Sequence, residues 1–379
     1  QRICGVCPVS HSHAATIAAE KAYGITISNN ARIIRNLIEG AQFLHSHILW
    51  FYNLAALDYV NPIHGLEANA ADAWDLAVAA GTSTNSDFGA LKERLTKFAQ
   101  NGQLSIFSGN WFDAEDGNAY KLPAELDLIC TAHYLEALKM QARSSEIAAL
   151  LGGKMPHVMT IVPGGTAFVP TSQKLDDLKY MIDEVYNWVE ATMIPDTLAI
   201  APYYKDALTF GKGCGRYGAW GVFEAPSMQM NDRYLPAGVL DTNLNLSDVD
   251  ESKIAEFVGT SWYEGSDVYP APDFTTKPAF TTYDVNDRYT WCKAPTYDGE
   301  PLETTSLSRI LVAYQRNVPF VKENVDKLLV QLGSALGTEV PLSAVQSTLG
   351  RVAVRQVETL YIAKLMKDWC AELIEAVTG

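Results

Sequence analysis

Cysteines and basic residues are scarce in this sequence, and it contains no long apolar run. Six cysteines in 379 residues do not make a disulfide framework. No segment reaches the ~20 consecutive apolar residues that cross a bilayer as a helix. Lysine and arginine total 29 against 44 acidic residues, so the formal net charge is −15 and phosphate backbones would be repelled. The sequence therefore favours neither a disulfide scaffold, nor a membrane span, nor a nucleic-acid partner.

The remaining composition is that of a globular protein. Hydrophobic residues make up 48% of the chain and charged residues 19%, which is enough apolar material for a large core. No signal peptide is recognisable, but the chain opens with Gln1 instead of Met. At the other end Leu373, Ile374 and Val377 still keep helical spacing. We therefore expect this sequence to be a piece of a longer protein whose termini lie outside it.

The clearest periodic segment begins at Asn30. Apolar residues recur there at three- and four-residue spacing, and no proline interrupts the pattern before Pro62. These apolar residues are Ile33, Ile34, Leu37, Ile38, Ala41, Leu44, Ile48, Phe51 and Tyr52. The pattern predicts one long helix over most of Asn30 to Leu57, and its wide apolar girth predicts burial on several sides.

Further helices are predicted on both sides of a different middle region. Their expected ranges are Asp87 to Gln100, Pro123 to Leu151, a segment capped by Thr171 or Ser172, a segment near Leu307, and Val345 to the end. Residues 200–300 are rich in Gly, Pro, Tyr, Asp and Thr, which predicts short strands and loops. The expected fold is mainly α, of the α+β class, with long buried helices around this middle. We expect residues 1–379 to form a single domain.

The segment that carries chemistry lies at the start of the chain. Cys4 and Cys7 are separated by two residues, a spacing that can present both sulfurs to one centre, and Gly5 permits the tight backbone this needs. His11 follows Cys7 by four residues, so one helical turn would bring its ring back toward that sulfur. His13 is expected to point elsewhere.

Spacing alone leaves three kinds of site open: structural zinc, a redox dithiol, or another metal. A zinc site is usually closed by four ligands, and the sequence has no second close cysteine pair, although His11 and His13 could complete one. A thioredoxin-like dithiol should follow a strand, which the chain begins too late to show. The other cysteines carry no motif and are expected to be ordinary buried residues: Cys130, Cys214, Cys292 and Cys370.

The motif from Arg2 to His11, Arg-x-Cys-Gly-x-Cys followed by His, resembles the amino-proximal signature of the nickel–iron hydrogenase large subunit. Other segments resemble the same family in the same order and cover nearly the whole chain. They are Arg35 to His45, His47 to Tyr52, Ala56 to Asp58, Gly102 to Leu104, Ala132 to Leu138, Gly152 to His157, Pro163 to Gly165, Lys293 to Pro295, Tyr297 to Gly299, and Ser347 to Arg351.

The resemblance implies the catalytic subunit of a hydrogenase, which interconverts H2 with protons and electrons at a nickel–iron centre. In this family the iron also carries cyanide and carbon monoxide. Cys4 is implied as a terminal nickel ligand and Cys7 as a sulfur that bridges both metals, a role for which soft thiolates are suited. His11 is implied to donate a hydrogen bond toward the bridging sulfur and so to tune its basicity.

The sequence also departs from the family pattern. Two of the family's four cysteine ligands belong to a C-terminal Asp-Pro-Cys-x-x-Cys motif that is absent here, as are an N-terminal Glu-containing segment and a late Ala-Pro-Arg-Gly segment. We expect all three to lie in missing parts of the protein. Many relatives carry aspartate between His45 and His47, where this chain has Ser46, so no role is carried over to that position. Both histidines are expected to be packed helix residues instead of ligands.

The resemblance further implies a heterodimer with a small subunit whose iron–sulfur clusters take the electrons, because this chain lacks cysteines for a cluster of its own. The segment Ala132 to Leu138 resembles the hydrogen-uptake type of this family. That type predicts a periplasmic or periplasm-facing, membrane-associated location, with the cytoplasm as the alternative. Two rival functions stay open: a relative of the quinone-site subunit of respiratory complex I, and a non-catalytic, zinc-stabilised interaction protein.

Overall fold

The computed structural model describes residues 3–104, 119–270, 276–282 and 288–378. Contacts divide the chain into two compact units. The first comprises Gln1–Gly211 with Pro319–Gly379, and the second comprises Lys212–Val318. Each unit is described separately below, and the expectation of a single domain over residues 1–379 stays a prediction.

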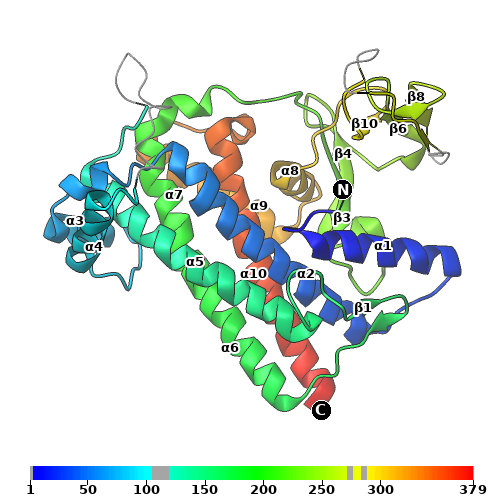
Figure 1. The fold of residues 1–379 in the computed structure, drawn as a ribbon, viewed down its shortest axis with the longest axis horizontal. Coiled ribbons are helices and arrows are strands. Elements are labelled where there is room, and N and C mark those ends of the chain that lie inside the picture. Colours follow the sequence, from blue (N-terminus) through cyan, green and yellow to red (C-terminus); the bar gives the residue numbers. More distant parts are fainter. Residues whose placement is uncertain (1–2, 105–118, 271–275, 283–287, 379) are drawn as a thin grey trace. The chain divides into compact units, whose positions relative to one another are not determined.

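The first unit consists mainly of helices (Figure 1). Their bounds are α1 Pro8–Tyr23, α2 Asn29–Leu49, α3 Ala70–Ala80, α4 Phe88–Gln100, α5 Ala124–Gly152, α6 Ser172–Trp188, α7 Ile194–Ile200, α9 Pro319–Leu336 and α10 Thr348–Thr378. A small antiparallel hairpin joins β1 (Ile161–Val162) to β2 (Gly165–Thr166). In the core, α2 packs against α5 and α10, while α6 packs against the same two helices on another side.

Helix α2 is the long buried helix that the apolar spacing predicted. It begins where the Ser28 hydroxyl accepts a hydrogen bond from the Ala31 amide at 3.3 Å. Its α-helical part ends at Leu49, but the chain continues as a π-helical turn over Trp50–Leu54 and a 3-10 turn over Ala55–Asp58. The helical path over most of Asn30 to Leu57 is therefore confirmed, with a change of pitch that the pattern did not indicate.

Glycine explains how closely α2 approaches α10. A Cβ atom at Gly40 would lie 2.8 Å from the side chain of Met366, so only glycine fits there without a shift of its neighbour. Where the two helices meet, Leu37, Ile38 and Ile362 are fully shielded from solvent. Close packing on several sides is why α2 is apolar over most of its girth.

The other predicted helices are confirmed with small shifts at their ends. Asp87 caps α4 by accepting a hydrogen bond from the Ala90 amide, and Thr171 caps α6 through the Lys174 amide. Helix α10 begins later than predicted, because residues Leu342–Gln346 form a 3-10 turn first. Helices α3 and α9 were not singled out by the sequence pattern. Short turns of 3-10 or π type complete this unit: η3 His64–Glu67, η5 Val189–Met193 and η6 Ala201–Leu208.

The second unit contains the short strands and loops that its composition predicted. One antiparallel sheet has the order β3 (Tyr217–Val222), β4 (Leu235–Leu240) and β5 (Leu246–Ser247). Another has the order β10 (Ala294–Tyr297), β6 (Ile254–Phe257) and β8 (Val268–Pro270), while β7 (Tyr263–Glu264) pairs with β9 (Lys277–Pro278). Helix α8 (Ser306–Gln315) packs on β3 and β4. Two 3-10 turns of the second unit are η7 (Met230–Asp232) and η8 (Glu251–Lys253). The mainly helical, α+β class is confirmed.

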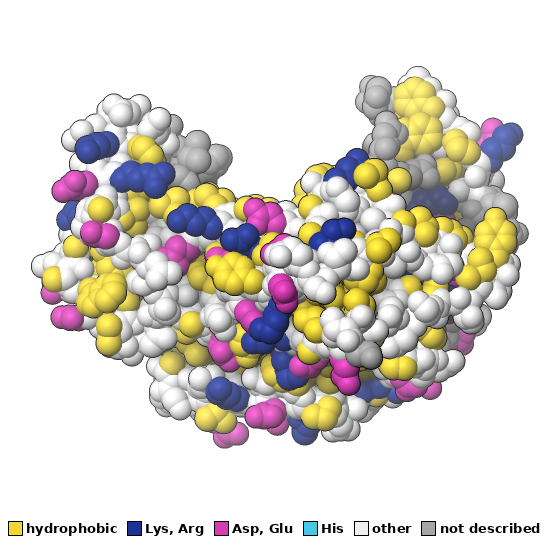
Figure 2. Space-filling view, turned by 90° about the horizontal axis from the view of Figure 1, so that it is seen from below, with side chains coloured by type: hydrophobic (Ala, Val, Ile, Leu, Met, Phe, Trp, Pro, Cys, Tyr) yellow, Lys and Arg dark blue, Asp and Glu magenta, His cyan; other side chains and the backbone are white. Residues whose placement is uncertain are grey.

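The surface shows how the acidic excess is distributed. On the face seen in Figure 2, acidic and basic side chains are interspersed with apolar ones instead of gathering by sign. Such a distribution is that of an ordinary solvated surface. Within the described ranges, none of the helices combines the length and the apolar character that crossing a membrane requires.

Candidate metal centre

Cys4 and Cys7 lie in the turn that leads into α1. Cys7 caps the helix and Pro8 is its first residue, a position that suits the fixed φ of proline. The Cys4 sulfur accepts hydrogen bonds from the amides of Val6 and Cys7, each with 3.3 Å between nitrogen and sulfur. The turn thus places the Cys7 backbone against the Cys4 sulfur, and the convergence of both sulfurs on one centre stays a prediction.

The two thiols differ in acidity. The pKa of Cys4 is lowered, chiefly because the backbone amide of Cys7 donates to its sulfur, with the Cys7 thiol and the Val6 amide adding to the effect. Burial raises the pKa of Cys7 to about 11, and its hydrogen bond with Cys4 adds to that rise. Both are free cysteines, and Cys4 is the more acidic of the two.

Glu39 of α2 holds the first turn of α1. The Ser10 hydroxyl donates to one Glu39 oxygen at 2.5 Å, and the Nδ1 atom of His13 lies 3.5 Å from the other. Glu39 and His13 are both buried, and the Glu39 charge is one of the causes that raise the pKa of Cys7. Sequence reasoning assigned Glu39 no role. The available signal was the single acid of a helix predicted to be buried, since such an acid needs a buried partner.

The two histidines of α1 have different surroundings. The imidazole of His11 is exposed, and the described part of the chain offers it no hydrogen-bond partner. Its implied hydrogen bond toward the Cys7 sulfur therefore stays a prediction. His13, which was expected to point elsewhere than the sulfur, faces Glu39. Arg2, the first residue of the motif, lies outside the described residues.

Gln42 ties the cysteine turn to α2. Its side-chain amide donates to the carbonyl oxygen of Val6 at 3.0 Å and to the Ser46 hydroxyl at 2.8 Å. Gln42 is buried, and its own Oε1 atom has no hydrogen-bond partner among the described residues. Ser46, which stands where many relatives carry aspartate, thus helps to position an amide that holds the residue between the two cysteines.

A buried ion pair anchors the other end of α1. Arg35 of α2 is fully shielded and makes two hydrogen bonds to Glu20, at 2.6 Å and 3.0 Å. Arg35 also donates to the carbonyls of Val162 and Gly165, while the Gly164 amide donates to Glu20. Burial alone would raise the pKa of Glu20, but the hydrogen bonds from Arg35 and Gly164 and the Arg35 charge lower it overall.

Farther along α2, His47 is held by α10. Its Nε2 atom lies 2.9 Å from a Glu358 oxygen, and its Nδ1 atom accepts from Arg355 at 3.1 Å. The Arg355 guanidinium in turn lies 4.0 Å from the centre of the Trp50 ring. Burial lowers the pKa of His45, whose Nδ1 atom has no partner among the described residues. These surroundings suit packed histidines better than metal ligands.

The donor set at the turn fits one side of a site for a soft metal. Two neighbouring free thiols are the ligands that nickel and low-spin iron prefer. Within the described ranges, no third His, Cys, Asp or Glu joins them to form a group that could hold a metal ion by itself. Among the residues that the structure describes, His11 and His13 therefore do not close a four-ligand site with Cys4 and Cys7. Of the other cysteines, Cys130 and Cys370 are buried as expected, but Cys214 and Cys292 are exposed, so that part of the expectation was wrong.

Comparison with known proteins agrees with this geometry. The sequence model of a family described as nickel-dependent hydrogenase matches residues 1–379. The uptake hydrogenase large subunit of Bradyrhizobium diazoefficiens is 34% identical over 414 residues, which cover 99% of this chain and 67% of that protein. The hydrogenase-2 large chain of Escherichia coli strain K12 is 31% identical over 395 residues, with 99% and 69% covered.

Solved structures give the same result. The Ni-Fe-Se hydrogenase of Desulfovibrio vulgaris Hildenborough in its as-isolated oxidised state superimposes with a TM-score of 0.75 at 30% identity, covering 98% of this chain and 67% of that one. A reduced, active Ni-Fe-Se hydrogenase from Desulfomicrobium baculatum superimposes with a TM-score of 0.72 at 27% identity, with 98% and 68% covered. The chain thus spans about two thirds of the length of the proteins it matches.

Proposed function

This chain belongs to the nickel-dependent hydrogenase family, and from that premise we propose that Cys4 and Cys7 bind the nickel–iron centre of a hydrogenase large subunit. The reaction is the reversible oxidation of H2 to protons and electrons. The observation that carries the ligand assignment is the pair of free cysteines in the turn before α1, where the Cys7 amide donates to the Cys4 sulfur. Cys4 is proposed as a terminal nickel ligand and Cys7 as the sulfur shared by both metals.

When bound, the nickel–iron centre supplies the site at which H2 is split and its electrons are taken up. The residues of this chain hold that site in place. Gln42 fixes the Val6 carbonyl between the two ligands, and Glu39 fixes the first turn of α1 through Ser10. Both act as positioning residues, because neither touches a ligand sulfur by a described hydrogen bond. Ligands held by such outer contacts keep the geometry that a metal centre needs.

The relatives are large subunits or large chains, and such names imply a small subunit. We propose an obligate heterodimer in which iron–sulfur clusters of the small subunit take the electrons. We further propose a periplasmic or periplasm-facing location. Support for the location is the resemblance of Ala132 to Leu138 to uptake-type enzymes. Cell fractionation with antibodies against the large subunit tests it, and recovery only in the cytoplasm would refute it.

The ligand assignment is tested in the full-length large subunit purified with its small subunit. We expect Cys4→Ser and Cys7→Ser to lose nickel and hydrogen-dependent dye reduction, because a hydroxyl cannot replace a soft thiolate. Cys214→Ser is the matched control, since Cys214 is an exposed free cysteine far along the sequence. Normal nickel content and turnover in the Cys7 variant would overturn the assignment.

The variant His11→Ala tests whether His11 donates a hydrogen bond toward the Cys7 sulfur. Removal of an outer hydrogen-bond partner typically costs about 10–100-fold in activity or metal affinity. We therefore expect nickel to stay bound while hydrogen oxidation slows by that range. Unchanged turnover would show that His11 is only a surface residue of α1, and complete loss of nickel would show that it is needed to build the site.

Elemental analysis of the same preparation addresses the two rival functions. Nickel together with iron is the result expected for this family. Zinc alone would support the zinc-stabilised interaction protein, and absence of all three metals would support a relative of the quinone-site subunit. Neither rival gains support from the family match over residues 1–379.

A further inference from the structure

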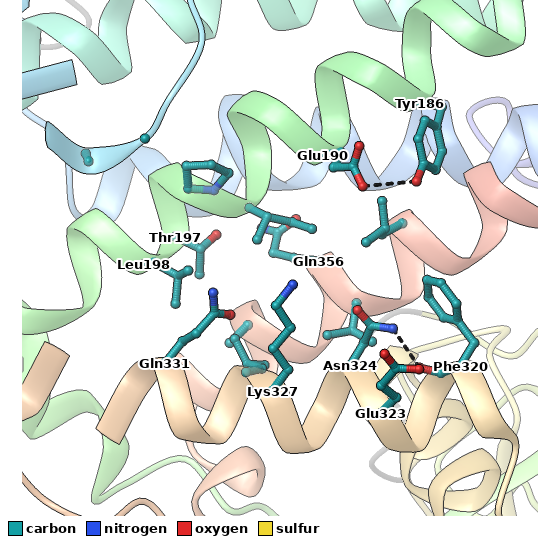
Figure 3. A pocket seen from close by; sticks show the side chains of 18 residues that line it. Tyr186, Glu190, Thr197, Leu198, Phe320, Glu323, Asn324, Lys327, Gln331 and Gln356 are labelled. Atoms are coloured by element: carbon teal, nitrogen blue, oxygen red, sulfur yellow. Dashed lines mark hydrogen bonds between the residues drawn. The ribbon is translucent and has the colours of Figure 1, made fainter. Parts of the chain in front are cut away.

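Two cavities of the first unit differ in how their polar groups are held. The larger, of about 460 Å³, lies between α7, α9 and α10, and Figure 3 shows the charged side chains of Glu190, Glu323 and Lys327 around it. All three are exposed, so water solvates them without a ligand. The smaller, of about 330 Å³, lies beside the 3-10 turn η3, and its lining includes His64, which a buried carboxylate holds. Of these two cavities, the smaller one therefore has the preorganised polar group.

The imidazole of His64 is held by Asp127 of α5. The Nδ1 atom of His64 lies 2.7 Å from Asp127 Oδ2, and the Asn61 amide donates to the other carboxylate oxygen at 2.8 Å. The Asp127 side chain is completely shielded from solvent, whereas 38% of the His64 side chain is exposed. Above its pKa of about 6, which burial raises, Asp127 is ionised and accepts the Nδ1 proton, so His64 Nε2 keeps its lone pair. Histidines that bind metals are held by carboxylates in this way.

The turn that carries His64 is seated closely on α5. A Cβ atom at Gly65 would lie 3.1 Å from the Leu128 nitrogen, so glycine lets the backbone of η3 lie against that of α5. The Asn61 side chain accepts hydrogen bonds from the amides of Ile63 and His64, at 3.0 Å and 3.3 Å. These contacts fix the backbone from which the imidazole extends, and its direction is therefore set before any ligand arrives.

Glu67 lies on the same side of η3 as His64. Side chains three residues apart are eclipsed in a 3-10 helix, and the Oε2 atom of Glu67 lies 4.0 Å from His64 Nε2. Two ligand atoms on one tetrahedral zinc ion, each bonded at about 2.0–2.2 Å, lie about 3.4 Å apart. Because 78% of the Glu67 side chain is exposed, it is free to rotate by the small amount that closes this difference.

The charges around the cavity favour a cation as its ligand. Glu67 and Asp127 both attract a positive ion. Lys121 also lines the cavity, but its ammonium lies 3.0 Å from each carboxylate oxygen of Asp206. An anion would therefore face the Glu67 carboxylate and would have to take Lys121 away from Asp206.

From this arrangement we propose that His64 Nε2 and the Glu67 carboxylate bind a divalent transition-metal ion of the zinc class. Imidazole and carboxylate are ligands that suit such ions. Asp127 is a positioning residue, because it contacts the ligand histidine and not the metal. Over the ranges that the structure describes, no third His, Cys, Asp or Glu joins the pair, so water molecules complete the coordination.

Zinc binding is measured by equilibrium dialysis and elemental analysis on the full-length large subunit with its small subunit. The preparation is loaded with its nickel and iron, and it carries no polyhistidine tag. We expect one zinc ion to bind at this pair with a Kd of about 100 µM or tighter, since two protein ligands hold zinc less tightly than a closed set of four. Zinc should also raise the midpoint of thermal unfolding, because it binds the folded protein only.

Three variants and one control assign the ion to these residues. His64→Ala should abolish zinc binding at this pair. Glu67→Gln should weaken it about tenfold or more without affecting folding, since its side chain is largely exposed. Asp127→Asn should weaken it by about 10–100-fold, as loss of an outer partner does. The control is His157→Asn, an exposed histidine to which the described residues give no carboxylate partner and whose φ of 62° suits asparagine.

Three results would overturn the proposal: a zinc Kd weaker than about 100 µM in wild type, wild-type zinc affinity in Glu67→Gln or His64→Ala, or an equal loss in His157→Asn. The proposal is independent of the nickel–iron centre. Nickel content and hydrogen-dependent dye reduction, measured without added zinc, should be the same in Glu67→Gln as in wild type. Failure here therefore leaves the ligand roles of Cys4 and Cys7 untouched.

Discussion

Both units carry exposed ion pairs, such as Lys121–Asp206 in the first, but the pairs with both side chains shielded are concentrated in the first unit. In the first unit, pairs such as Arg35–Glu20 and His133–Asp196 connect helices and are almost completely shielded from solvent. In the second unit, Lys253–Asp298 and Lys277–Glu264 are largely exposed. Arg233–Glu224 is a buried pair there, but it joins the two ends of a single connection, the one between β3 and β4.

This difference indicates that ion pairs contribute differently to the stability of the two units. Buried pairs are costly to form but strongly directional, so they suit a unit whose helices must hold a small turn in place. Exposed pairs add little and tolerate change, so they suit a region held by short sheets and by contacts among Trp262, Phe280 and Trp291. The comparison makes predictions that can be ordered by the size of the expected effect.

The largest effect is expected for Arg35→Met. Removal of the guanidinium leaves Glu20 as a buried, uncompensated charge and takes a donor away from the carbonyls of Val162 and Gly165. Breaking a buried ion pair costs about 3–5 kcal/mol. The loss of stability is measured as the difference in free energy of unfolding between variant and wild type, by titration with guanidinium chloride. Adding Glu20→Leu to Arg35→Met should recover part of the loss, because the unpaired charge is then removed as well.

The second effect is a pH dependence that comes from Asp127 of α5. Burial raises the pKa of Asp127 to about 6, although the Asn61 amide and His64 both hydrogen-bond to it. An ordinary aspartate titrates near 3.8. The folded protein therefore holds this proton more tightly than the unfolded chain does. The resulting stabilisation is complete below about pH 4 and is lost as the pH rises through about 6, a change of about 3 kcal/mol.

Asp127→Asn should flatten this part of the pH dependence, which unfolding measurements at pH 4, 5, 6 and 7 would show. Asp248→Asn in the second unit is the control. The Arg316 guanidinium hydrogen-bonds to Asp248 and holds the pKa of that carboxyl below its usual range, so its titration falls outside this interval. An equal change in both variants would mean that burial does not distinguish the two carboxylates.

A smaller effect is expected at the metal centre. Ser10→Ala removes the donor to Glu39, and an unpaired buried acceptor costs about 1–3 kcal/mol. Because Ser10 lies in the turn that follows Cys7, nickel occupancy of the full-length protein should fall as well. Ser12→Ala on the same helix is the control, since the described residues give its hydroxyl no partner. Equal behaviour of the two variants would show that Glu39 does not position the turn.

These residues also mark how far the sequence allowed prediction. Local periodicity was sufficient to predict helices α2, α4, α5 and α6, because a few turns of sequence determine both helix formation and the face that is buried. The π turn at Trp50–Leu54 was missed, since the widening of a helix depends on its packing partners and not on local spacing. Cys4 and Cys7 were singled out because only two residues separate them. Glu39 was not, because its partner Ser10 lies 29 residues away in the chain.

The smallest effect is expected for Lys277→Met in the second unit. Lys277 donates to Glu264 at 2.8 Å across the β7–β9 pair, but both side chains are more than half exposed to solvent. Water and salt screen such a pair, and ordering two long side chains offsets most of the attraction. We expect the midpoint of thermal unfolding to be the same as in wild type at low and at high ionic strength. A loss as large as that of Ser10→Ala would mean that exposed pairs hold the second unit together as firmly as buried pairs hold the first. The contrast between the units would then lie in their secondary structure and not in how they use charge.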